Sequence, residues 1–244
     1  MGNIEFFNEL AHKRILSNAR MVSLNFDVYA KTFADIDRKL KFTSADSVLD
    51  LGGGTGQIAG LIARKSRQVV LTDGAAEALK VARESLANPP NVSCRQLNLE
   101  RLPLPFAGDV FDKVVCYSVV HYLSDHNHFI KLLSEMLRVT KPGGQILVGD
   151  IPLTDKGRQY LAERRKHPFR NLLGNLQYYL KKTLTTWRYH LKGINDSQIS
   201  GLAYTKTQLA SLLGRLRGIN YEWLEQDSNL PFVNSREDLL ITKR

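Results

Sequence analysis

Short apolar runs alternate with longer amphipathic stretches from residue 47 to residue 150. The apolar runs are rich in residue types that favour strands, and they span residues 47–51, 68–72, 92–97, 113–118 and 145–150. The stretches over residues 58–65, 75–86 and 128–139 carry apolar residues at three- and four-residue spacing, as helices with one buried face do. This alternation predicts a parallel sheet with helices on both of its faces.

Two further strands are predicted near the end of the sequence, over residues 220–226 and 238–244, after a helix that begins at Thr205 or Thr207. The segment between these strands is too short for a crossover helix, so the last strand is predicted to be antiparallel. The predicted fold is therefore α/β, a doubly wound sheet of seven mostly parallel strands. A helical insertion follows the fifth strand.

A length of 244 residues is ordinary for one α/β domain, so residues 1–244 are predicted to form a single domain. Residues 1–40 are predicted to form N-terminal helices, and residues 41–152 form the core. Residues 153–200 are the insertion, which is predicted to act as a lid. Residues 201–244 supply the C-terminal helix and the last two strands.

The formal net charge of +10 is concentrated in the insertion, where ten basic and only two acidic residues lie between Thr154 and Lys192. Apolar residues recur from Leu172 to Leu191 at three- and four-residue steps, which predicts an amphipathic helix laid over the body. The positive charge of this segment can attract nucleic acid, an anionic membrane surface or a phosphorylated or carboxylated small molecule. A solvated helix face is the alternative interpretation.

Composition and cysteine content indicate where this protein works in the cell. No apolar run reaches the roughly 18 residues that span a bilayer, and the first residues lack an apolar signal core, so a cytoplasmic protein is expected. The two cysteines, Cys94 and Cys116, fall in strand-like apolar runs, where free buried thiols are common. They indicate neither a disulfide nor a metal site.

The candidate chemistry begins directly behind the first predicted strand, in the stretch VLDLGGGTGQ. A turn built from Gly52, Gly53, Gly54 and Gly56 can adopt positive φ and expose backbone amides to a ligand at the start of a helix. This signal is weak alone, because the permissive dinucleotide pattern G-x-G-x-x-A also fits from Gly54. The phosphate-binding loop that ends in Gly-Lys-Ser/Thr is absent.

The stretch DLGGGTG resembles the first motif of class I S-adenosylmethionine-dependent methyltransferases of the small-molecule type. The resemblance covers residues 44–150 in register and resumes loosely over 204–244. NLERLPLPFAGDVFDKVV is similar to the family segment that passes the adenine, and TKPGGQILV to the turn before the fifth strand. A dehydrogenase-like dinucleotide fold is the alternative.

The resemblance implies S-adenosylmethionine as the cofactor and residues 41–152 as its binding core. Asp50 would organise the loop around the methionyl part, Asp73 would accept from the ribose hydroxyls, and Asn98 would contact the adenine where the family commonly has Asp. An amide oxygen can still accept there. The predicted cofactor-binding residues are Asp50, Gly52, Gly53, Gly54, Gly56, Asp73, Gly74, Asn98, Leu99 and Ser118.

The predicted catalytic residues follow the fourth and fifth strands. His121 stands where the family often has a histidine, and an imidazole can act as a base near neutral pH. Asp150 could orient an acceptor or take its proton. The alternatives are a structural hydrogen bond for His121 and a turn cap before Pro152 for Asp150. Tyr117 is predicted to line the pocket.

The leading functional hypothesis is transfer of a methyl group to an O, N or C atom of a small, anionic metabolite or biosynthetic intermediate. An RNA methyltransferase whose basic insertion binds phosphates is the alternative, although no nucleobase signature follows the fourth strand. A non-catalytic module that regulates a partner is a third hypothesis. Contact of the basic helix with a membrane surface also stays open.

Overall fold

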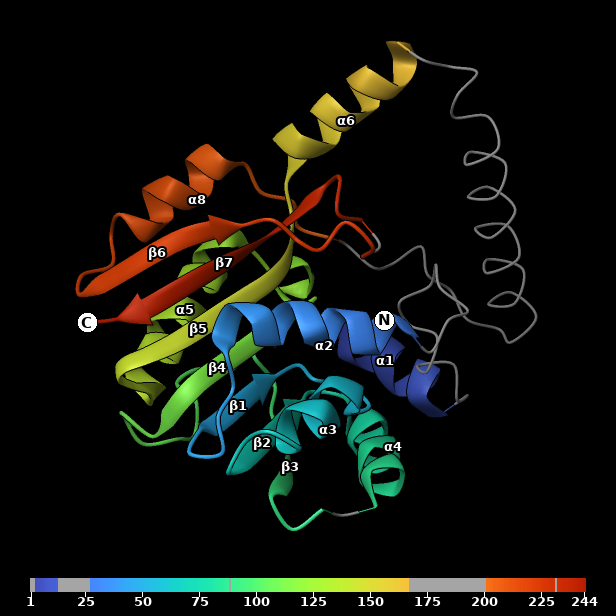
Figure 1. The fold of residues 1–244 in the computed structure, drawn as a ribbon, viewed down its shortest axis with the longest axis vertical. Helices are drawn as coiled ribbons and strands as arrows, with labels where there is room; N and C mark the ends of the chain where they lie inside the picture. Colours follow the sequence, from blue (N-terminus) through green and yellow to red (C-terminus); the bar gives the residue numbers. More distant parts are fainter. Residues whose placement is uncertain (1–2, 13–26, 88, 167–200, 231) are drawn as a thin grey trace.

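The computed structural model describes residues 3–12, 27–87, 89–166, 201–230 and 232–244. These residues form a seven-stranded sheet with the strand order β3-β2-β1-β4-β5-β7-β6 (Figure 1). Its strands are β1 (Ser47–Leu51), β2 (Gln68–Asp73), β3 (Val92–Gln96), β4 (Phe111–Tyr117), β5 (Thr140–Pro152), β6 (Ile219–Leu224) and β7 (Arg236–Lys243). β7 runs antiparallel to both β5 and β6, and the other neighbouring pairs are parallel. The predicted fold class is confirmed.

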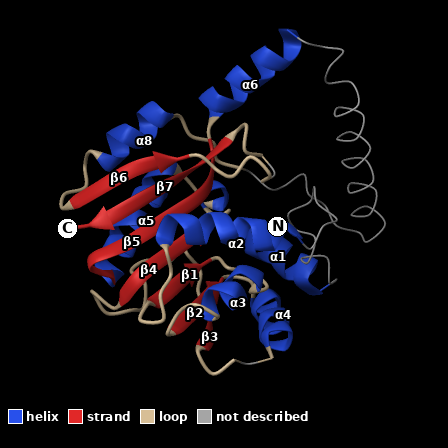
Figure 2. Cartoon of the chain, in the orientation of Figure 1, coloured by secondary structure: helices blue, strands red, loops and turns tan. Residues whose placement is uncertain are grey.

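Helices cover both faces of the sheet (Figure 2). They are α1 (Asn3–His12), α2 (Asp27–Leu40), α3 (Gln57–Ala63), α4 (Ala76–Leu86), the short 3-10 helix η2 (Val120–Tyr122), α5 (His126–Val139), α6 (Thr154–Lys166) and α8 (Lys206–Leu213). Because side chains alternate along a strand, Val114 and Cys116 of β4 face α5 and α8, while Val115 and Tyr117 face α2 and α3. Each face of the sheet therefore has its own apolar core.

Local signals explain where two of these helices begin. The Asp125 carboxylate accepts from the His128 amide at 2.7 Å and caps α5. At α8, Thr205 and Gln208 form a reciprocal capping box, so of the two predicted starts, Thr205 and Thr207, the structure selects Thr205.

The predicted turn before the fifth strand is wrong in one respect, because β5 already begins at Thr140. Gly143 lies inside the strand with φ of +76°, and the pairing of β4 with β5 shifts register between Phe111 and Lys113. The Pro-Gly-Gly stretch therefore bulges the strand instead of preceding it.

The insertion departs from the body at the end of β5, where α6 extends away from the sheet (Figure 1). Residues 167–200, which include the predicted leucine-rich helix, lie outside the described residues. No helix among the residues that the structure describes is long and apolar enough to cross a membrane.

Candidate active site

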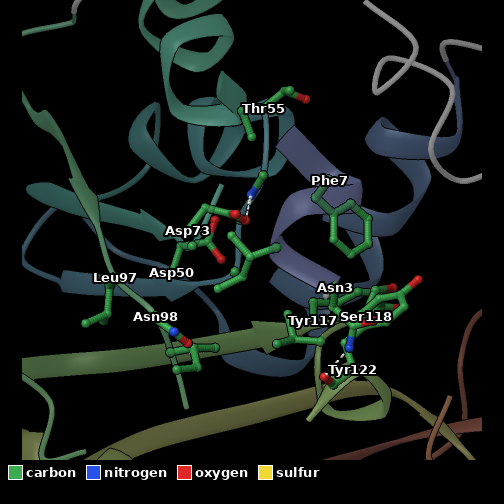
Figure 3. A pocket seen from close by; sticks show the side chains of 18 of the residues that line it. Asn3, Phe7, Asp50, Thr55, Asp73, Leu97, Asn98, Tyr117, Ser118 and Tyr122 are labelled. Atoms are coloured by element: carbon green, nitrogen blue, oxygen red, sulfur yellow. Dashed lines mark hydrogen bonds between the residues drawn. The ribbon is translucent and has the colours of Figure 1, made fainter. Parts of the chain in front are cut away.

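A cavity of about 710 Å³ opens at the carboxyl ends of β1, β2 and β4 (Figure 3). This is the position where open parallel sheets bind ligands, because the strand order reverses between β1 and β4. The volume falls within the range of about 300–1,000 Å³ that small-molecule sites occupy. The predicted residues that line it are Asp50, Gly52, Gly53, Gly54, Asp73, Gly74, Asn98, Leu99, Tyr117 and Ser118.

The glycine turn is folded tightly against β2. The Gly53 amide donates to the Thr72 carbonyl at 3.0 Å, and the Gly56 amide donates to the Gly53 carbonyl at 3.1 Å. A Cβ on Gly53 would lie 2.3 Å from Asp50 Oδ2, so no side chain fits between the turn and the carboxylate. This turn brings the backbone itself to the cavity, as the sequence predicts.

Gly56 is the one predicted cofactor residue that does not line the cavity. It precedes α3 with φ of +80°, and a Cβ there would meet Leu86 and Leu71 at 3.0 and 3.2 Å. Gly56 therefore turns the chain and lets α3 pack closely, instead of facing a ligand.

Asp50 is a buried carboxylate at the floor of the cavity, and its Oδ2 has no hydrogen-bond partner among the described residues. Burial first, and then the nearby Asp73 carboxylate, raise the pKa of Asp50 to about 7. An orphaned buried acceptor of this kind is costly unless a ligand supplies a donor or a positive charge. The floor of the cavity thus suits a cationic ligand.

Asp73 fixes the two neighbouring loops. Its Oδ2 accepts from the Gly54 amide at 2.9 Å, and its Oδ1 accepts from the Ala75 amide at 2.8 Å. Burial raises the pKa of this carboxyl, while the amides of Ala75, Gly54 and Gly74 act in the opposite direction. Each carboxylate oxygen has a second lone pair, so the pair of hydroxyls on a ribose can still be accepted.

The adenine end of the predicted site is shaped by two backbone contacts. Asn98 Oδ1 accepts from the Glu100 amide at 2.9 Å, and the Leu99 carbonyl lies 2.7 Å from His128 Nε2. These bonds hold Asn98 and Leu99 in a turn along the cavity wall.

Helix α1 lies over the cavity and contributes residues that the sequence analysis does not assign to the site (Figure 3). Asn3 Nδ2 donates to the Tyr122 carbonyl at 2.7 Å, and the Phe7 ring meets the Tyr122 ring edge-on with centroids 5.0 Å apart. Ile4 packs on Gly74, where a Cβ would lie 2.9 Å from its Cδ1. The sequence predicts N-terminal helices within residues 1–40 but gives no signal of what they cover.

Tyr29 of α2 lines the cavity, whereas Phe33 stacks on Phe42 with ring centroids 6.4 Å apart. Of these two aromatic residues, only Tyr29 can contact a ligand directly.

Neither predicted catalytic residue lines the cavity. His121 is buried, its ring packs on Tyr122 with centroids 4.1 Å apart, and its carbonyl accepts from the Leu202 amide at 2.7 Å. Asp150 is also buried, but its Oδ2 accepts from the hydroxyl of Ser118, which does line the cavity, at 2.5 Å. A direct hydrogen bond to Ser118 therefore joins Asp150 to the cavity lining.

The sheet has this strand order, an acid and a glycine turn at the end of its first strand, and a second acid at the end of the next. Together these features define a Rossmann-like fold of the methyltransferase type. The family described as "Methyltransferase domain" matches residues 49–148. This part of the chain is therefore similar to a methyltransferase domain.

Named relatives agree with this assignment over the same part of the chain. A ubiquinone/menaquinone biosynthesis C-methyltransferase, UbiE, of Pectobacterium carotovorum is 41% identical over 107 residues, which is 41% of this chain and 41% of the relative. The UbiE protein of Marinomonas sp. is 39% identical over 111 residues, 43% of this chain and 42% of the relative. The match thus spans less than half the length of these curated relatives.

Solved structures share the fold over nearly the whole chain. The phosphoethanolamine N-methyltransferase 1 of Haemonchus contortus, solved with phosphoethanolamine and S-adenosylhomocysteine, is 15% identical with a TM-score of 0.67, over 98% of this chain and 47% of that one. The N-methyltransferase NodS of Bradyrhizobium japonicum, with S-adenosylhomocysteine, is 13% identical with a TM-score of 0.62, over 97% and 98%.

Proposed function

We propose that this protein transfers a methyl group from S-adenosylmethionine to an O, N or C atom of a small organic molecule. The observation that carries the proposal is the buried Asp50 carboxylate, which faces the cavity beside the glycine turn with one oxygen that lacks a partner among the described residues. A cofactor with a sulfonium and an ammonium group supplies the positive charge and donors that such a site needs.

The cofactor supplies an activated methyl group when bound, and the protein's residues hold, orient and enclose it. Asp50 and the amides of the glycine turn would hold the methionyl end, Asp73 the ribose, and Asn98 with Leu99 the adenine. Asn3 and Phe7 of α1 would close the cavity over it and exclude water. Positioning of this kind can supply up to about 7–11 kcal/mol of the barrier.

Two regions of opposite charge, the cavity and the basic insertion, bear on which acceptor the protein binds. Among the described residues that line the cavity, Glu5, Asp50, Asp73 and Glu100 carry carboxylates, and none is Lys, Arg or His. Recognition of an anionic acceptor therefore falls to the basic insertion between Thr154 and Lys192. Most of that segment lies outside the described residues.

The test uses the full-length protein in two steps. Calorimetric titration with S-adenosylmethionine should show one site, and methyl-labelled cofactor should then label one of two probe acceptors. Naphthohydroquinone represents the quinone pathways named for the relatives, and phosphoethanolamine represents a small phosphate-bearing amine. No cofactor binding at millimolar concentration would contradict the proposal.

A further inference from the structure

The carboxyl ends of β4 and β5 carry an unusual backbone feature. Ser118 and Asp150 both adopt positive φ, +60° and +61°, although neither is glycine. This conformation costs roughly 1–2 kcal/mol for an L-residue, and such residues gather at functional sites. In β5, the pairing with β7 also shifts register between Val148 and Ile151, on either side of Asp150.

The two residues meet because β4 and β5 are neighbours and come very close at this point. The Ser118 amide donates to the Gly149 carbonyl at 3.1 Å. A Cβ on Gly149 would lie 2.1 Å from the Tyr117 ring, so only glycine allows that ring to pack there. The Ser118 hydroxyl then donates to Asp150 Oδ2 at 2.5 Å, a short bond between a cavity-lining residue and a buried carboxylate behind it.

Groups from β7 and from the segment before it hold Asp150 in place. Its amide donates to Asp238 Oδ1 at 2.8 Å, and its carbonyl accepts from Arg236 at 3.0 Å. Gln226 Nε2 lies 3.5 Å from Asp150 Oδ1 and donates to Asp238 Oδ1 at 2.9 Å.

The same network ends on one buried cation. Lys39 Nζ lies 2.7 Å from Asp238 Oδ2 and 2.6 Å from Asp35 Oδ2, and all three side chains are almost fully buried. Burial raises the pKa of Asp238 although Lys39 opposes that shift. The Asp150 carboxylate is therefore buried and held by hydrogen bonds, and the Ser118 hydroxyl joins it directly to the cavity lining.

We propose that Ser118 and Asp150 form a proton relay for the methyl acceptor, an inference that rests on the proposed function. While the acceptor atom forms its bond to the methyl carbon and the carbon–sulfur bond breaks toward sulfur, the acceptor's proton passes to Ser118 Oγ. The proton that Ser118 carried passes to Asp150 Oδ2 and later returns to solvent. The relay serves an acceptor that must lose a proton, such as an aromatic hydroxyl compound. For an ammonium group, the relay takes the proton before the nitrogen lone pair attacks the methyl carbon.

The relay makes different predictions for its two members. Asp150→Asn keeps an oxygen that accepts from Ser118 but cannot take a proton, so it should bind probes normally and transfer slowly. Ser118→Ala removes the group that contacts the acceptor, so it should weaken both binding and transfer. Ser134→Ala and Asp112→Asn are the matched controls, since both residues lie away from the cavity lining.

The experiment uses the full-length protein with naphthohydroquinone and phosphoethanolamine as probes. Probe dissociation constants are measured by calorimetry in the presence of S-adenosylhomocysteine, which permits no turnover, and initial rates are measured with methyl-labelled cofactor. Ser118→Ala should raise the dissociation constant about fivefold, as loss of one hydrogen bond does. Asp150→Asn should leave it unchanged while lowering the maximal rate about 100-fold, within the range of general-base contributions.

The pH profile separates proton transfer from a structural role. The rate of Asp150→Asn should recover as pH rises toward the acceptor's own pKa, near 10 for a phenol or an ammonium group. Rates within threefold of the controls, or a loss that no pH restores, would overturn the relay. If the wild-type protein binds cofactor but labels neither probe, the proposed function for these acceptor classes is contradicted, and the relay with it. If the wild-type protein is active and the variants are unaffected, only the relay is contradicted.

Discussion

Buried carboxylates have opposite surroundings in two regions of the sheet. The first region lies at the carboxyl ends of β1 and β2, and the second lies at the carboxyl ends of β4 and β5. Near the end of β1, Asp50 keeps one oxygen without a partner among the described residues. Near the end of β5, Asp150 accepts from Ser118 and donates its amide to Asp238 of β7. Asp238 in turn accepts from Gln226 and pairs with Lys39. The first region is incomplete until a ligand binds, whereas the second is already assembled.

This difference shows how one sheet supports binding and positioning together. A buried carboxylate that lacks a partner is stabilised most by a ligand that brings positive charge. A network whose members already hold each other fixes geometry and costs no reordering when a ligand arrives. Loss of the unpartnered carboxylate in the first region should therefore change cofactor affinity and the pH dependence of stability, whereas loss of the buried cation in the second should lower stability itself.

The largest expected effect on this comparison is loss of the buried cation. Lys39→Met removes the cation paired with buried Asp238 and leaves Asp35 with Arg38 as its other partner. The change should destabilise the protein by about 3–5 kcal/mol, since the buried Asp238 carboxylate loses its counter-charge. At about 2–4 °C per kcal/mol for a chain of this size, the melting temperature should fall by roughly 10 °C.

The matched control is Lys65→Met, because Lys65 pairs with Asp37 on the surface with 48% of its side chain exposed. Exposed pairs contribute about 0–1 kcal/mol. Equal melting temperatures for the two variants would contradict the view that the second region is a stabilising network.

The next effect concerns cofactor affinity. Asp50→Asn removes a charged acceptor worth about 1.5–3 kcal/mol and should weaken S-adenosylmethionine binding roughly 10- to 100-fold, measured by calorimetry at pH 8. Wild-type affinity should strengthen as pH rises through about 7, the pKa of Asp50, because the cation prefers the ionised carboxylate. Asp50→Asn should lose this part of the pH dependence, and an unchanged profile would count against the assignment.

The same group should make the cofactor-free protein less stable at higher pH. The folded protein keeps a proton on Asp50 up to about pH 7, whereas the unfolded chain loses it near the ordinary value of 3.8. Folding therefore takes up protons between these values, and stability falls as pH rises through that window. Asp50→Asn should gain up to about 4 kcal/mol relative to the wild type between pH 4 and pH 8, measured by urea unfolding without cofactor.

A smaller effect is expected within the glycine turn. Gly53→Ala places a Cβ against Asp50 and Leu71. It should lower the free energy of unfolding by about 1–3 kcal/mol and should also weaken cofactor binding. Gly54→Ala meets open space and should suffer only from its φ of +58°, at about 1 kcal/mol. The reverse order in urea unfolding would show that backbone conformation, and not contact with Asp50, dominates this turn.

The smallest effect should come from helix α1. Asn3→Ala removes the hydrogen bond to the Tyr122 carbonyl and should weaken cofactor affinity about fivefold. His12→Ala, an exposed change at the other end of the same helix, is the control and should bind as the wild type does. Equal affinity in both variants would remove α1 from the binding site.

The sequence alone predicted the sheet and its antiparallel last strand, which the structure confirms, and the residues of the first region of the candidate site. These features are local, because a strand, a glycine turn and a helix follow one another directly, and parallel strands bring the acids that end them to one edge. Asp50 and Asp73 could be assigned from that rule and from the family resemblance.

Only the tertiary structure decided which distant segments complete the site. Asn3 reaches Tyr122 across 119 positions of sequence, and no periodic pattern encodes such a contact. Ser118 and Asp150 each stood out in the sequence, but their hydrogen bond depends on the adjacency of β4 and β5 and on two positive φ angles. Strand order and backbone strain are settled by packing of the whole chain, and local sequence does not record them.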